Sequence, residues 1–100
     1  MSLLASLLPS DTNNVILYEA QGTKLEALTV FIHNKETSSK VYSLAVVNKD
    51  EVVASKDYIV NAVSLFSKDT DQLSVSLTKK QQIVVSVGTG STINFLVFDE

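Results

Sequence analysis

Short apolar segments, each bounded by a polar turn, recur along the whole chain and constrain its fold more than any other feature. The clearest example is residues 73–77, in which leucine and valine alternate with serine. Because a β-strand places successive side chains on opposite faces, Leu73, Val75 and Leu77 should point into a core and the two serines outward. The segment therefore predicts a strand that is buried on one face.

Similar segments follow one another at intervals of about 8 to 12 residues, which is typical of a β-sandwich or a small barrel. The expected strands are residues 15–18, 25–33, 41–47, 58–60, 73–77, 83–87 and 93–98. Residues 51–56 fit a strand or one helical turn, and residues 62–66 fit a connection or an edge strand. Residues 88–91 (Gly-Thr-Gly-Ser) should close a hairpin between the last two strands. We predict an all-β, antiparallel β-sandwich of immunoglobulin-like or jelly-roll-like type, with seven to eight strands.

The first twelve residues are expected to form an N-terminal arm that precedes a β-sandwich domain over residues 13–100. Leu3, Leu4, Leu7 and Leu8 have the spacing of one apolar helical face. A helix this short is marginal by itself in water, so it needs a groove in which to bury that face. The groove can belong to the same sandwich or to a neighbouring subunit, and the pattern leaves both open.

Composition excludes several classes of function. The chain has no cysteine, so disulfides and thiolate chemistry are not available. The net charge is −3, and every cation is a lysine without a basic stripe around it, so we expect no nucleic-acid partner. No apolar run reaches the roughly 20 residues of a membrane span, and the N-terminus lacks the basic start of a signal peptide. We therefore expect a soluble protein, made in the cytoplasm, with no membrane partner.

No pattern of residues predicts an enzyme. The one histidine, His33, falls near the end of an expected strand, and no serine has the context of a nucleophile elbow, so we expect a surface or turn histidine. Asp69 and Asp71 lack the glycine and the distal glutamate of a calcium loop. Residues 88–90 resemble part of a phosphate loop but precede a strand rather than a helix. We predict a non-enzymatic protein with no catalytic residue, metal or cofactor.

Two expected strands, residues 41–47 and 93–98, are apolar on both faces, although a sheet face in contact with water should be polar. Either a neighbouring subunit or a loop of the same chain must cover the second face, and we favour a homo-oligomer. The candidate interface residues are Leu3, Leu4, Leu7, Leu8, Phe95 and Phe98. The alternative function is a module that binds carbohydrate or another host-surface ligand, and its candidate ligand-binding residues are Tyr18, Tyr42 and Tyr58.

The order of short motifs along the chain is also distinctive. These motifs are Leu-Leu-Pro at 7–9, Val-Ile-Leu-Tyr at 15–18, Gly-Thr-Lys at 22–24, Ile-His-Asn at 32–34, Tyr-Ser-Leu-Ala-Val-Val at 42–47 and Ile-Asn-Phe-Leu-Val-Phe-Asp-Glu at 93–100. This order resembles the small β-sandwich virion structural proteins of tailed bacteriophages, of the head-decoration, neck or tail-fibre type. The resemblance implies a virion protein that is made in the host cytoplasm. It also implies self-assembly, with a trimer favoured, and contacts with other virion proteins.

Overall fold

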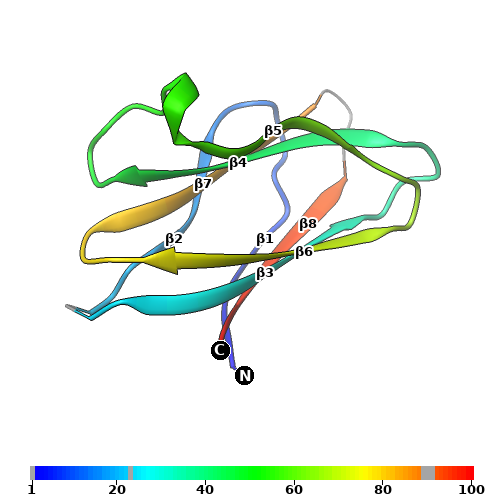
Figure 1. The fold of residues 1–100 in the computed structure, drawn as a ribbon. Coiled ribbons are helices and arrows are strands. Elements are labelled where there is room, and N and C mark those ends of the chain that lie inside the picture. The colour runs from blue at the N-terminus through cyan, green and yellow to red at the C-terminus, as the bar shows by residue number, and fades with distance from the viewer. Residues whose placement is uncertain (1, 23, 89–91) are drawn as a thin grey trace.

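Two four-stranded antiparallel sheets pack face to face in the computed structural model (Figure 1). The structure describes residues 2–22, 24–88 and 92–100. Sheet A has the strand order β1-β8-β3-β6, and sheet B has the order β2-β7-β4-β5. In chain order the elements are β1 (Leu3–Leu7), β2 (Val15–Glu19), β3 (Glu26–Asn34), β4 (Lys40–Asn48), the 3₁₀ turn η1 (Ser55–Asp57), β5 (Tyr58–Leu65), β6 (Thr70–Leu77), β7 (Gln81–Val87) and β8 (Ile93–Asp99). The predicted antiparallel β-sandwich of seven to eight strands is confirmed.

The core lies between the two sheets and is built by the alternation that the sequence shows. β3 and β6 pair without any shift in register, from Glu26 opposite Leu77 to His33 opposite Thr70. Side chains on the inner face of this pair are buried or half-buried, and most of those on the outer face are polar. The largest fully buried side chains are Tyr42, Phe95, Leu28, Ile32, Leu44, Leu65, Leu77, Ile83 and Ile93. Removing each such side chain from water is worth about 1.5–3 kcal/mol and drives the two sheets together.

The expected hairpin between the last two strands is wrong. β7 lies between β2 and β4 in sheet B, whereas β8 lies between β1 and β3 in sheet A. Both strands are apolar on alternate residues, and each gains two hydrogen-bonding neighbours by standing at the centre of a different sheet. Only β4 and β5 are adjacent both in the chain and in a sheet. Residues 89–91, where the turn was expected, lie outside the described residues.

The helical reading of the N-terminus is also wrong, because residues Leu3–Leu7 form strand β1. β1 pairs with β8, with Leu7 opposite Phe95, so a strand of the same chain receives its backbone hydrogen bonds. The backbone N–H of Ser2 donates to the Asp99 carboxylate at 2.5 Å, which brings the two termini side by side (Figure 1). Pairing with β8 satisfies the backbone hydrogen bonds of this short segment. A helix of two turns would be only marginally stable alone in water. The segment thus packs on its own sandwich, one of the two alternatives that its sequence left open.

The middle of the chain settles two further alternatives. Residues Ser55–Asp57 form a 3₁₀ turn, and residues 62–65 belong to the edge strand β5. Ala62 has a φ of 52°, and its backbone N–H donates to the Ser43 hydroxyl at 2.8 Å. The pairing of β4 with β5 shifts register twice around this point. β5 is therefore a strongly irregular edge.

Candidate interaction surface

Among the residues that the structure describes, the strand pairings place no aspartate, glutamate or lysine side chain on the outer face of sheet A. The strand pairings place a common set of outward residues on this surface, which we call face A. Its members are Leu3, Ser6, Ala27, Thr29, Phe31, His33, Thr70, Gln72, Ser74, Ser76, Asn94, Leu96 and Phe98. Aspartate, glutamate and lysine make up 19% of the chain, yet none of them is in this set. A charge-free sheet face of this extent is unusual for a surface that only meets water.

An apolar stripe runs across face A from β1 to β3. It consists of Leu3, Phe31, Leu96 and Phe98. The rings of Phe31 and Phe98 meet edge to face, with centroids 5.5 Å apart and planes at 88°. Leu96 stands directly opposite Phe31 in the β3–β8 pairing, and Leu3 is 54% exposed beside Phe98. The hydroxyl and amide side chains of β6 border this stripe on the far side of β3.

The six candidate interface residues fall in four different environments. Leu3 and Phe98 lie on the apolar stripe, while Leu4 and Leu8 are also exposed. Leu7 packs against the core.

Phe95 is 0% exposed inside the sandwich, because odd-numbered residues of β8 point inward and even-numbered ones outward. Phe95 therefore has no surface to offer a partner. Phe31 and Leu96 were not among the six candidates, although the same alternation places both on the outer face.

The three tyrosines named as ligand candidates do not form an exposed stacking surface. Tyr42 is 1% exposed and donates its hydroxyl hydrogen to Asp71 at 2.7 Å. Tyr18 is also buried and donates to Glu26 at 2.7 Å. Burial, helped by the Glu26 carboxylate, raises the pKa of Tyr18 to about 12, and burial together with Asp71 raises that of Tyr42 further. Tyr58 is half-buried at the start of β5.

His33 stands on face A, where its Nδ1 atom lies 2.8 Å from the Thr70 hydroxyl oxygen. This is a cross-strand pair between β3 and β6, and it ties the histidine to a threonine rather than to a nucleophile with an orienting acid. Within residues 2–22, 24–88 and 92–100, no three histidine, aspartate or glutamate side chains gather in a way that could hold a metal ion.

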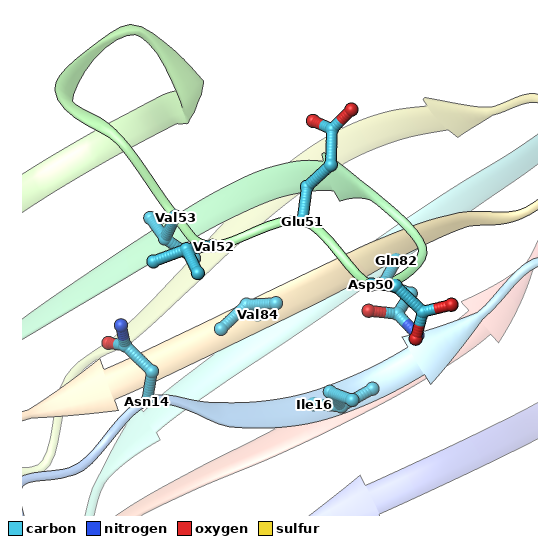
Figure 2. A pocket seen from close by; sticks show the side chains of 8 residues that line it. All are labelled: Asn14, Ile16, Asp50, Glu51, Val52, Val53, Gln82 and Val84. Carbon is cyan, nitrogen blue, oxygen red and sulfur yellow. The ribbon is translucent and has the colours of Figure 1, made fainter.

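A connection of the same chain covers part of the outer face of sheet B, although Ile16 remains 55% exposed there. The connection from β4 to β5 passes over β7, so that Val52 and Val53 lie above Val84 and Ile16 (Figure 2). A cavity of about 360 Å³ remains beneath this connection, with Asn14, Asp50, Glu51 and Gln82 at its polar rim. Ala45 and Val47 of β4 are buried although they stand outside the core between the sheets. The same chain therefore covers the Ala45 and Val47 part of the second apolar face of β4, whereas Val41 is 38% exposed.

Comparisons with family models, with curated proteins and with solved structures gave no significant match. Among the residues that the structure describes, there is no helix long and apolar enough to cross a membrane.

Proposed function

We propose that this chain is a non-enzymatic structural subunit that self-associates through face A, as a component of a phage virion. The observation that carries the proposal is the absence of ionised side chains on face A, together with its apolar stripe. A loop of the same chain lies over part of the outer face of sheet B, whereas on sheet A Leu3 is 54% exposed and Phe31 and Phe98 are partly exposed. A second subunit is the natural cover for such a face.

Charge favours a second copy of the chain as the partner. Each copy carries a net charge of −3, so two copies repel one another unless their charged side chains stay away from the contact. Face A meets this condition on both sides, because every copy presents the same uncharged surface. Burial of apolar surface yields about 25 cal/mol per Å², from which the cost of association is subtracted. Facing hydroxyl and amide groups can hydrogen-bond around the apolar stripe.

The virion assignment rests on the order of motifs from residues 7–9 to residues 93–100, which resembles that of head-decoration, neck and tail-fibre domains. Those proteins work as subunits of an assembly, which is the role that an uncharged face suits. Mass spectrometry of purified particles from the phage that encodes the chain tests the assignment. We expect the chain as a stoichiometric component of the particle, and its presence only in the lysate would contradict the virion role.

The self-association is tested by placing one charge on face A. Leu3 is 54% exposed, so Leu3→Lys should fold normally while it puts two like charges into the contact. The control is Val52→Lys, because Val52 is 88% exposed on the loop over sheet B. Light scattering after size exclusion should show that Leu3→Lys weakens association at least about tenfold, equivalent to 1.4 kcal/mol, while Val52→Lys behaves as the wild type. Equal masses for all three proteins would contradict the role of face A.

A further inference from the structure

The four edge strands of the sandwich differ in how well they are protected against pairing with another strand. β1 and β2 are five residues long, and the pairing of each with its neighbour contains a register shift. β5 is interrupted by Ala62 in a left-handed conformation. Short length, bulges and irregular backbone are the means by which proteins prevent edge-to-edge association. β6 has none of them, since it pairs with β3 over eight residues without a shift.

The sequence of β6 also lacks the usual protective residues. Residues 72–77 (Gln-Leu-Ser-Val-Ser-Leu) contain no charge, no proline and no glycine. The one acid of the strand, Asp71, lies at its beginning and accepts a hydrogen bond from the buried Tyr42. In the part of the chain that the structure describes, the backbone hydrogen bonds outside the strand ladders do not involve residues 70–77. The Thr70 N–H donates to the Asp69 carboxylate at 2.9 Å, so the open row of backbone donors and acceptors on the side of β6 that faces away from β3 comprises residues 71–77.

We infer that β6 is a pairing edge, at which β6 of a second copy adds antiparallel to form one continuous eight-stranded sheet. The inference rests on the proposed self-association and gives it a second surface. In antiparallel pairs, residues directly opposite share a face of the sheet. With Val75 opposite its own equivalent, Leu73 meets Leu77 and Ser74 meets Ser76 of the second copy. This register matches apolar with apolar and hydroxyl with hydroxyl, and brings Asp71 close to the Lys79 of the second copy.

Two features favour a second copy over a foreign strand. The partner must alternate apolar and small polar side chains in the same register, and β6 itself supplies that pattern. β6 also carries the outward residues Gln72, Ser74 and Ser76 of face A, so the pairing extends the uncharged face across both subunits. The contact has two-fold symmetry and therefore joins two subunits only. Contacts through face A can then connect these pairs into a larger assembly.

A single engineered cysteine tests the edge, because the chain has no cysteine of its own. Ser74 is exposed on β6, and Ser64 is exposed on the irregular edge β5, so Ser64→Cys is the matched control. We expect a short bis-maleimide to convert most of Ser74→Cys into a covalent dimer and to leave Ser64→Cys monomeric. No dimer of Ser74→Cys, or an equal yield from both variants, would overturn the inference.

Amide hydrogen exchange measured residue by residue separates the edge from face A. Alternate amides of residues 70–77 point away from β3, and they should exchange at least about tenfold more slowly once the protein associates. Association without this protection would overturn the edge inference and leave the proposed function intact. A Leu3→Lys variant that keeps the amide protection, the cross-linking yield and the solution mass of the wild-type assembly would support the edge and overturn the role of face A.

Discussion

At the scale of single residues, a few polar side chains hold the connections between strands in place. The Glu26 carboxylate accepts hydrogen bonds from the Tyr18 hydroxyl at 2.7 Å and from the backbone N–H groups of Gln21 and Gly22 at 2.7 and 3.1 Å. It thereby fastens the connection from β2 to β3. The hydrogen bond from Tyr18 is the main reason why the pKa of Glu26 lies below its ordinary value.

This lowered pKa predicts a loss of stability in acid. Because the pKa of Glu26 is lower in the folded than in the unfolded chain, its contribution is complete above the ordinary pKa of 4.5. The contribution is lost as the pH falls through the folded-state pKa. Glu26→Gln keeps one acceptor oxygen, so it cannot accept from the two backbone N–H groups on one oxygen and from the Tyr18 hydroxyl on the other. At pH 7 the substitution should lower the free energy of unfolding by about 1 kcal/mol. Urea denaturation at several pH values should show this difference shrinking below pH 4.5.

The exposed Glu100 provides the control, as Glu100→Gln removes the same charge without disturbing a connection between strands. Stability curves of Glu26→Gln and wild type that stay parallel from neutral pH down to acid would contradict the role of the Glu26 carboxylate.

At the scale of the elements, alternation in the sequence located most of the strands, with β1 as the exception, but not their neighbours. Residues 73–77 alternate so clearly that the strand could be predicted with its inward face, whereas residues 93–98 are apolar on both faces, so the strand could be predicted without its inward face. Which sheet each strand joins depends on contacts between distant residues, and the strand period carries no information about them. For this reason β7 and β8 were expected to pair, although they lie in different sheets.

The same distinction explains how much of the candidate surface could be predicted. Leu3 was named from the spacing of an apolar helical face and Phe98 from a strand that is apolar on both faces, and both lie on the stripe. Phe31 and Leu96 share the outward direction of Phe98 by alternation, and the β3–β8 register places them directly opposite one another. Phe95 shows the reverse case, because an apolar residue at the right spacing belongs to the core when its parity points inward.

The strand assignment of the N-terminus makes a prediction that a helix would not make. In β1 the side chain of Leu7 packs against the core, whereas Leu8, beyond the end of the strand, is 47% exposed. Leu7→Ser should lower the free energy of unfolding by about 2 kcal/mol, because it removes apolar contacts and puts a hydroxyl in their place. Leu8→Ser should change it by less than about 0.5 kcal/mol. Chemical denaturation of both variants measures the difference, and equal effects would favour the helical face.

At the scale of the whole molecule, the two outer faces of the sandwich differ in how much of each is covered by the chain itself. The connection from β4 to β5 passes over part of sheet B, and the outward side chains Ala45 and Val47 of β4 are buried, while Val41 is exposed. On sheet A, Leu3 of the apolar stripe is exposed, and the edge strand β6 pairs with β3 without a register shift. The chain therefore concentrates its uncharged, unprotected surface on one side, and its charged side chains lie elsewhere.

This separation predicts how association responds to salt. Screening shortens the range of charge interactions from about 10 Å at 0.1 M to about 3 Å at 1 M ionic strength. A contact held by opposite charges weakens under these conditions, whereas an uncharged contact between two negatively charged subunits does not. The ion pair between Asp71 and Lys79 at the inferred edge stabilises the contact by at most about 1 kcal/mol. High salt weakens this ion pair, but it also reduces the repulsion between the negatively charged subunits, and the two effects offset one another. Sedimentation equilibrium should therefore give association constants at 0.1 M and 1 M sodium chloride within about tenfold of one another. Dissociation into monomers at high salt would show that charge, rather than face A, holds the subunits together.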